Sequence, residues 1–140
     1  MYKVFFNQKP LILTNKLHEA TDKSPLVFVK YTNAALIIKA LKSKNNDKVY
    51  LYHKNIDKLW KTFLKKFPMI EAAGGLVQRD DGKFLFIFRN NKWDLPKGGI
   101  EKKELTIEAA KREVTEETGV ADIIVNNQLP ETYHIFKTVS

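Results

Sequence analysis

The chain begins with short apolar runs separated by turn residues, a pattern that is typical of a small α/β unit. The runs predict four β-strands, at residues 2–6, 11–14, 26–31 and 48–53. Two further stretches have helical spacing and capping residues. One helix is predicted to follow Asn33, and the other to open at Asn55 or Asp57 and to end at Pro68. We therefore interpret residues 1–67 as an α/β extension.

The second of these helices has a continuous apolar face. Apolar residues recur every three or four positions along it, and lysines occupy other positions. We expect this face to lie in a core or an interface rather than at a ligand site. Its members are Ile56, Leu59, Trp60, Phe63, Leu64 and Phe67.

Residues 68–140 have a different pattern, in which glycine-containing turns separate the apolar segments. A strand is predicted over residues 71–79 and a two-residue hairpin turn at Asp81-Gly82. KFLFIFR, residues 83–89, is apolar on both faces, so it predicts a buried central strand. The loop NNKWDLPKGGIEKKE follows, and ADIIVNNQL and TYHIFKTVS predict two more strands near the end.

One helix is predicted in this half, from Thr106 as its N-cap to Thr118, with Gly119 as its left-handed stop. One stripe of the helix is expected to pack on the sheet. That stripe consists of Ile107, Ala110, Val114 and Thr118.

An adjoining stripe of the same helix carries Glu113, Glu116 and Glu117. Like charges this close repel by about 0.2–0.5 kcal/mol per exposed pair. Carboxylate oxygens suit hard cations such as Mg²⁺ and Mn²⁺, which would relieve that repulsion. Arg112, four residues from both Glu108 and Glu116, can hold a glutamate by a forked hydrogen bond. From the helix alone, a metal site and an ordinary charged surface are equally good interpretations.

Composition and charge narrow the class of protein. The chain has 140 residues, 44% of them hydrophobic, and no cysteine, which excludes disulfides and thiol chemistry. No signal peptide or membrane span is predicted, so we expect a soluble cytoplasmic protein. Residues 1–67 contain 14 lysines, no arginine and four acids, a net charge of +10, whereas residues 68–140 carry ten basic and twelve acidic residues, a net of −2. The basic half could attract a polyanion, but lysines on solvated faces are the simpler interpretation.

The glutamates stand in a fixed spacing. Gly98 is followed after five residues by Glu104 and after seven more by REVTEETGV, residues 112–120. This spacing resembles the Nudix box, G-x5-E-x7-R-E-U-x-E-E-x-G-U with U aliphatic, at all nine defined positions over 23 residues. AAGGLV and WDLPKGGIE also resemble flanking segments of that family. The resemblance covers about residues 69–140 and leaves residues 1–67 outside.

The resemblance implies a Nudix hydrolase with an α/β/α sandwich around a mixed sheet. It implies hydrolysis of a pyrophosphate bond in a nucleoside diphosphate linked to another group, or in a related polyphosphate, with Mg²⁺ or Mn²⁺. The residues that it assigns to metal binding are Glu113, Glu116, Glu117 and the backbone carbonyl of Lys97-Gly98. Glu113 or Glu117 would also act as base, Arg112 would orient a glutamate, and Glu104 would support the loop.

Domains of this family continue further past the box than the twenty residues that follow Val120. The resemblance therefore predicts a domain that lacks its C-terminal part. We expect an unfinished sheet edge, or the 56–67 helix, to favour a homodimer.

Substrate contacts are expected at Arg89, Lys97 and Trp93, and also at Lys92. Arg89, Lys92 and Lys97 would bind phosphate, and the alternative is that each is an ordinary surface charge. Trp93 would stack on a base, and the alternative is that it packs under the loop. The LPKGG segment hints at dinucleoside polyphosphates or diphosphoinositol phosphates. The alternative function is a non-catalytic nucleotide sensor whose basic N-terminal part binds nucleic acid. The lack of arginine there argues against nucleic acid as a partner.

Overall fold

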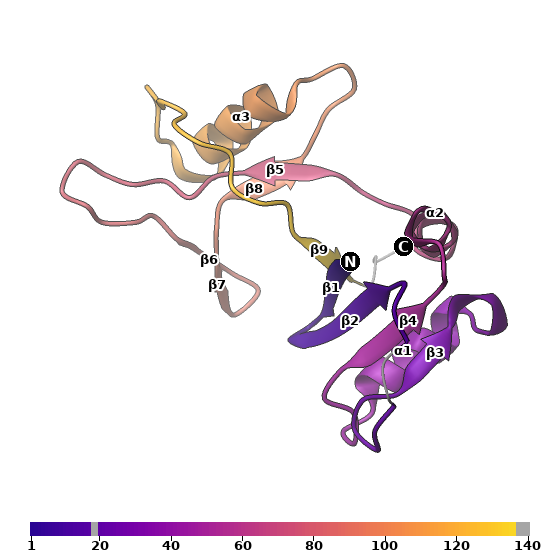
Figure 1. The fold of residues 1–140 in the computed structure, drawn as a ribbon. Helices are drawn as coiled ribbons and strands as arrows, with labels where there is room; N and C mark the ends of the chain where they lie inside the picture. Colours follow the sequence, from indigo (N-terminus) through magenta and orange to yellow (C-terminus); the bar gives the residue numbers. More distant parts are fainter. Residues whose placement is uncertain (18–19, 137–140) are drawn as a thin grey trace. The chain divides into compact units, whose positions relative to one another are not determined.

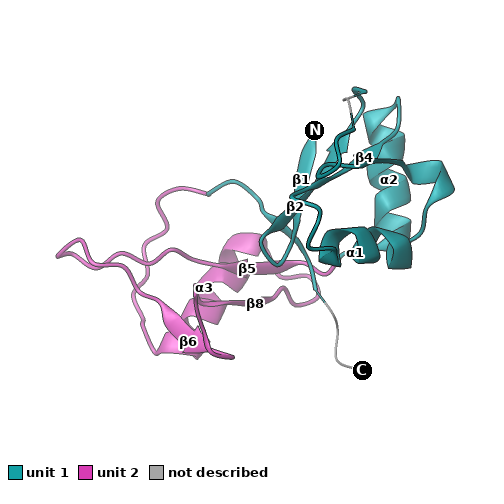
Figure 2. Ribbon diagram, turned by 90° about the horizontal axis from the view of Figure 1, so that it is seen from below, with its two compact units in different colours: residues 1–69, 129–140 teal, residues 70–128 magenta. Residues whose placement is uncertain are grey.

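The computed structural model describes residues 1–17 and 20–136, and its contacts divide the chain into two units. Unit 1 comprises residues 1–69 and 129–140, and unit 2 comprises residues 70–128 (Figure 2). Three α-helices accompany the strands of the described residues, so the predicted α/β class is confirmed. None of the helices in this part of the chain has the length and apolarity needed to cross a membrane.

Unit 1 is built on a five-stranded mixed sheet with the order β3-β4-β2-β1-β9 (Figure 1). The β1–β2 pair is antiparallel, and the other three pairs are parallel. Each strand is a short apolar run that lies within or overlaps a strand predicted from the sequence. The strands are β1 (Tyr2–Phe6), β2 (Lys9–Thr14), β3 (Leu26–Phe28), β4 (Val49–Tyr52) and β9 (Tyr133–Ile135).

Two helices of unit 1, α1 (Ala34–Lys42) and α2 (Ile56–Lys66), pack against β2. Asn33 caps α1 by accepting a hydrogen bond from the Leu36 amide, at 2.9 Å, and Asn55 caps α2. The core consists of alternate strand residues and one face of each helix, so both helices cover the same side of the sheet. The predicted apolar face of α2 contributes to this core. Its buried members are Leu59 and Phe63.

Two predictions about unit 1 need correction. The strand predicted over residues 26–31 ends at Phe28, because a 3₁₀ turn, η1 (Val29–Tyr31), places Val29 in the core. Of the strands predicted after residue 120, only β9 forms among the described residues, and it pairs with β1. The last part of TYHIFKTVS lies outside the described residues.

Unit 2 contains two small antiparallel sheets and one helix (Figure 1). β5 (Ala72–Gly74) pairs with β8 (Lys97–Gly99), and β6 (Ile87–Arg89) pairs with β7 (Lys92–Asp94). Helix α3 (Thr106–Thr118) packs on β5 and β8. Gly119 ends α3 with φ of 74°, a left-handed conformation that glycine adopts at little cost.

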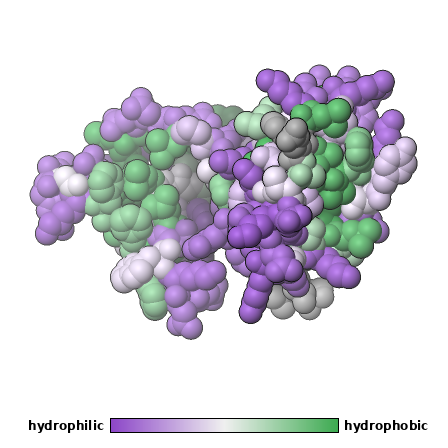
Figure 3. All heavy atoms as spheres, turned by 60° about the horizontal axis from the view of Figure 1, so that its bottom comes forward, coloured by the Kyte–Doolittle hydropathy of each residue, from purple (hydrophilic) through white to green (hydrophobic). Residues whose placement is uncertain are grey.

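The prediction of a buried central strand at residues 83–89 is wrong. Only Ile87–Arg89 is a strand, and the described residues offer it a single partner, β7. Phe84 and Phe86 are each 50% exposed and Phe88 is 60% exposed. Figure 3 shows hydrophobic residues at the surface of the molecule, among them a group on its left side. A segment with apolar side chains on both faces can be buried on both faces. The pattern does not show whether other strands or helices are present to cover it.

The N-terminus and the packed stripe of α3 also differ from expectation. Leu105 is the N-cap and Thr106 the first helical residue, because the Glu108 carboxylate accepts a hydrogen bond from the Leu105 amide, at 3.4 Å. The buried residues are Ala109, Glu113 and Val114, whereas Ile107 is exposed. The helix is therefore turned so that Glu113 faces the strands.

The turn predicted at Asp81-Gly82 forms, with one more residue in its loop. The Arg79 amide donates to the Lys83 carbonyl, and the Gly82 amide donates to the Arg79 carbonyl, both at 2.8 Å. Gly82 has φ of 86°.

Candidate active site: glutamates held by Arg112

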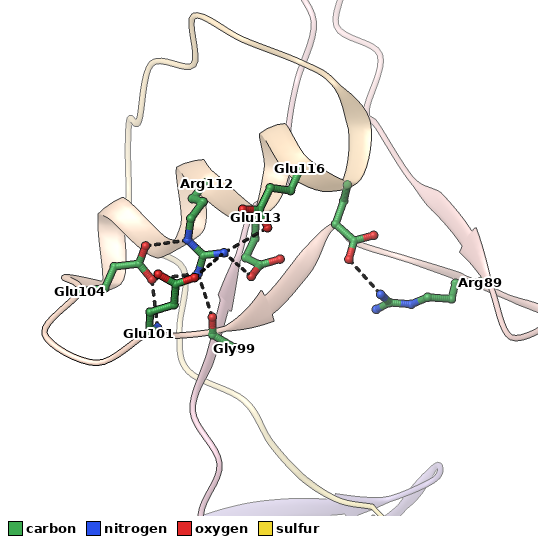
Figure 4. Close-up of polar contacts among 8 residues, drawn as sticks. Arg89, Gly99, Glu101, Glu104, Arg112, Glu113 and Glu116 are labelled. Atoms are coloured by element: carbon green, nitrogen blue, oxygen red, sulfur yellow. Dashed lines mark hydrogen bonds and ion pairs between the residues drawn. The ribbon is translucent and has the colours of Figure 1, made fainter. Parts of the chain in front are cut away.

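Arg112, near the middle of α3, is the centre of a charged cluster (Figure 4). Its Nε donates to Glu104 at 2.7 Å, and its Nη2 donates to the other oxygen of the same carboxylate at 2.9 Å. This forked pair joins α3 to the loop before it. Such bidentate pairs are stronger and more directional than single hydrogen bonds.

The same guanidinium also binds two of the predicted metal ligands. Its Nη1 lies 2.7 Å from Glu113 and 3.1 Å from Glu116. Its Nη2 donates to the Gly99 carbonyl at 3.0 Å. The predicted tether therefore exists, but it runs to Glu104, Glu113 and Glu116, because Glu108 is used at the helix N-terminus.

Glu104 is fixed from both sides. Besides the Arg112 fork, it accepts a hydrogen bond from the Glu101 amide at 3.0 Å. The hydrogen bond from Arg112, and then that from Glu101, lower the pKa of Glu104 to about 2. The hydrogen bonds that Arg112 donates to Glu104 and Glu113 raise the pKa of Arg112, so the Arg112–Glu104 ion pair stays charged at neutral pH.

Acid should weaken this anchor in a defined window. Because the pKa of Glu104 is lower when folded, its contribution to stability is present above its ordinary pKa near 4.5 and is lost as pH falls through about 2. We expect the difference in melting temperature between the parent chain and Glu104→Gln to shrink from pH 5 to pH 2. Thermal unfolding at a series of pH values measures this, and a constant difference would contradict it.

Glu113 is the buried member of the glutamates, at 9% exposure. Its carboxylate lies against Gly98 in β8, so closely that a Cβ at position 98 would overlap it. Glycine is therefore required at position 98 because the Glu113 carboxylate approaches its Cα closely, and not because the backbone there has an unusual conformation. The resemblance assigned Gly98 to metal binding through its carbonyl, and the structure adds that its lack of a side chain makes room for Glu113.

This packing predicts contrasting effects at two adjacent glycines. Gly98→Ala should displace the Glu113 carboxylate, lowering both the melting temperature and the hydrolysis proposed below. Gly99→Ala should be tolerated in both measurements, because an added Cβ there meets nothing within 4 Å. Equal effects of the two substitutions would contradict this account of the site.

Glu117 has a different partner. Arg89, at the end of β6, lies with its Nη1 3.0 Å from one Glu117 oxygen (Figure 4). Arg89, a predicted phosphate contact, is thus brought next to a predicted metal ligand from 28 residues away in sequence.

The donor set fits a hard divalent cation by its chemistry. Glu113, Glu116 and Glu117 each have one carboxylate oxygen bound to an arginine, which leaves the second oxygen as a potential ligand. The residues that the structure describes, however, contain no group of three acidic or histidine side chains close enough together to hold a metal ion. In this structure each of the three glutamates forms a hydrogen bond with an arginine.

The side chains of the other predicted substrate residues, Lys97 and Trp93, have contacts outside the Arg112 cluster. The Lys97 ammonium pairs with Asp94 at 3.1 Å, and both side chains are partly exposed. Trp93 is 72% exposed, and its ring lies 5.1 Å from that of Phe88. Trp93 also lines a shallow hollow with Phe84, Leu85 and Phe86. It is therefore not packed under the loop, and an aromatic ring of a ligand could reach it.

Sequence reasoning missed two members of the cluster. The Gly99 carbonyl accepts from Arg112, and Glu101 lies 3.7 Å from the same guanidinium. Backbone acceptors leave no signal in side-chain patterns. An arginine has five N–H donors, and one carboxylate cannot accept all of their hydrogen bonds. This number could have indicated that Arg112 has acceptors besides one glutamate.

Comparison with known proteins identifies the family. The family model described as NUDIX domain matches residues 68–138, and the chain belongs to this family. The fixed spacing of the box, which folds into α3 and the loop before it, agrees with that assignment.

Individual relatives each match part of the chain. The RNA pyrophosphohydrolase of Bartonella henselae is 39% identical over an alignment of 82 residues, which covers 51% of this chain and 47% of the relative. That of Erythrobacter litoralis is 40% identical over 74 residues, covering 48% and 42%. A MutT-like protein of Streptomyces ambofaciens is 43% identical over 51 residues, covering 35% and 33%.

The chain spans less than half the length of each of these three relatives. No solved structure matches it significantly.

Proposed function

We propose that this protein hydrolyses a pyrophosphate bond in a nucleotide-type polyphosphate, with a divalent cation as cofactor. The observation that carries the proposal is the cluster on α3, in which Arg112 holds Glu104, Glu113 and Glu116 while Arg89 holds Glu117. The approach of Gly98 to the buried Glu113 carboxylate, beside two further glutamates, supports a functional site over a plain charged surface.

The residues proposed to hold the cation, Mg²⁺ or Mn²⁺, are Glu113, Glu116 and Glu117, with the Gly98 carbonyl. When bound, such a cation neutralises diphosphate charge and activates a water for attack on phosphorus. Glu113 or Glu117 would accept the proton of that water. Arg112 and Glu104 would act as positioning residues, because they fix α3 relative to the loop that carries Gly98.

Arg89 and Lys97 are proposed to bind the phosphates of the substrate. Arg89 is paired with Glu117 and Lys97 with Asp94. Each side chain would have to leave its carboxylate partner before it could bind a phosphate of the substrate. Trp93 is proposed to stack on a base, for which its exposed ring is suited.

For the substrate we propose the polyphosphate end of an RNA, because several relatives are named RNA pyrophosphohydrolase. A nucleoside diphosphate linked to another group is the broader class. Dinucleoside polyphosphates, indicated by the LPKGG segment, are the competing choice. A non-catalytic nucleotide sensor remains the alternative function, and it would bind the nucleotide without releasing phosphate.

The test is phosphate and pyrophosphate release by the full chain from one panel of substrates. The panel contains 5′-triphosphate RNA, diadenosine polyphosphates, ADP-ribose and nucleoside triphosphates, each with Mg²⁺ or with a chelator. The proposal expects Mg²⁺-dependent release, fastest from the RNA. Binding without release would favour the sensor, and faster release from diadenosine polyphosphates would overturn the substrate assignment.

We also propose that residues 68–140 act as the Nudix part and residues 1–67 as a separate extension in the cytoplasm. The family match at residues 68–138 supports this division. The two structural units do not follow this division after residue 128. Residues 129–140 belong to unit 1, because β9 pairs with β1 in its sheet. A homodimer through a sheet edge remains a proposal, whereas the apolar face of α2 is used within the core of unit 1.

A further inference from the structure

The five-stranded sheet of unit 1 has one face that no described helix of the unit covers. Both α1 and α2 pack on the other face, where Val4, Leu11 and Leu51 lie in the core (Figure 2). Because side chains alternate along each strand, the neighbours of these core residues point to the open face.

The strand registers place the residues of the open face in rows. One row pairs Phe28 of β3 with Tyr52 of β4. The next pairs Ile12 of β2 with Lys3 of β1. A third row runs across three strands, from Pro10 through Phe5 to His134. The open face thus carries rings on β3, β4, β1 and β9, and Pro10, Ile12 and the buried Thr14 on the central strand β2.

The aromatic rings are accessible at the β3 edge. Phe28 is 46% exposed and Tyr31, in the 3₁₀ turn that follows, is 83% exposed. The ring of Phe28 lies 5.3 Å from that of Tyr52 and 6.4 Å from that of Tyr31. An exposed aromatic group of this kind is unfavourable in water unless a partner stacks on it.

The charge on the open face is positive. The Lys3 ammonium lies 6.0 Å from the centre of the Phe5 ring, and the Lys48 ammonium lies 5.4 Å from that of Tyr50. None of the five strands contains an aspartate or glutamate, and residues 1–67 carry a net charge of +10. Lysines beside aromatic rings on a sheet therefore offer contacts to phosphates and to bases together.

We propose that this open face, defined by Lys3, Phe5, Phe28, Tyr31, Lys48 and Tyr52, binds single-stranded RNA. Unpaired bases stack on aromatic side chains of a sheet, and the cations between them bind the backbone. A double helix hides its bases, so it could use only the charges. The inference goes beyond hydrolysis and does not depend on it, since binding can be measured without a cofactor.

RNA binding is tested with the full chain by fluorescence anisotropy, using a labelled single-stranded RNA at several salt concentrations. Phe28→Ala with Tyr31→Ala should weaken binding roughly tenfold or more, because each stacked base contributes that order of affinity. The salt dependence should stay unchanged in this variant, since no charge is removed. Both residues are exposed, and circular dichroism checks that the variant is folded.

A second pair of variants separates the open face from general charge. Lys3→Gln with Lys48→Gln should reduce the slope of log affinity against log salt by about 1.4, because each lysine that contacts a single strand contributes about 0.7. Lys61→Gln with Lys65→Gln removes the same charge from the exposed side of α2 and should leave the slope unchanged.

The outcomes that overturn the proposal are distinct. No RNA binding by the parent chain at low salt would exclude the site. An equal reduction of the salt slope in the Lys61→Gln, Lys65→Gln control would mean that RNA binding depends on net charge and not on the open face. Equal affinity for single-stranded DNA would overturn the choice of RNA. Metal-dependent release of phosphate from the other substrates of the panel does not require the open face, so a failure here is distinguishable from a failure of pyrophosphate hydrolysis.

Discussion

Glutamine at both Glu116 and Glu117 is expected to lower Mg²⁺-dependent hydrolysis by more than about 100-fold. Substitution of residues that only support a metal ligand costs about 10- to 100-fold, and loss of two ligands should exceed that range. Glutamine keeps the size of glutamate and removes the negative charge that a hard cation requires. Initial rates over a range of Mg²⁺ concentrations measure the loss.

The matched control for this variant lies on the same helix. Glu108 binds the Leu105 amide at the N-terminus of α3, and a glutamine there can still accept that hydrogen bond. Glu108→Gln should therefore retain most of the activity. If the double variant retained activity as well as this control, Glu116 and Glu117 would not be metal ligands.

Arg112→Lys is expected to lower hydrolysis by about 10- to 100-fold. Arg112 binds both oxygens of Glu104 and also Glu113, Glu116 and the Gly99 carbonyl. Lysine has the same charge but only three donors on one nitrogen, so it cannot span these acceptors.

Arg79→Lys is the control for this substitution. Arg79 pairs with Asp81 on an exposed hairpin, away from the box, and its replacement should leave the rate unchanged. A lysine at position 112 that supported full activity would contradict the role of the forked hydrogen bonds. It would leave Arg112 as a charge on the surface of α3.

Much of unit 1 could be predicted from its sequence, because its local signals and its packing agree. Asn33 and Asn55 cap the helices that their positions indicated, and the apolar face of α2 enters the core. The pairing of β9 with β1 could not be predicted. Its partner lies more than a hundred residues away, and a short apolar run does not specify its partner.

The positions of the candidate site residues on one helix could be predicted from the sequence, and their contacts could not. The spacing of the box brought Glu113, Glu116 and Glu117 onto neighbouring positions of one helix, as expected. Which of them is buried depends on the rotation of α3, and the apolar stripe alone gave the wrong rotation. The pairing of Arg89 with Glu117 depends on the path of the chain between β6 and α3.

Binding of Mn²⁺ to the parent chain and to Glu116→Gln with Glu117→Gln tests most directly the claim that these glutamates form a metal site. Titration calorimetry without substrate separates this claim from the choice of substrate. We expect the parent chain to bind Mn²⁺, the Glu108→Gln control to bind it equally, and the double variant to lose most of its affinity. Equal binding in all three proteins, or none in the parent, would contradict the account and return the glutamates to a charged helix surface.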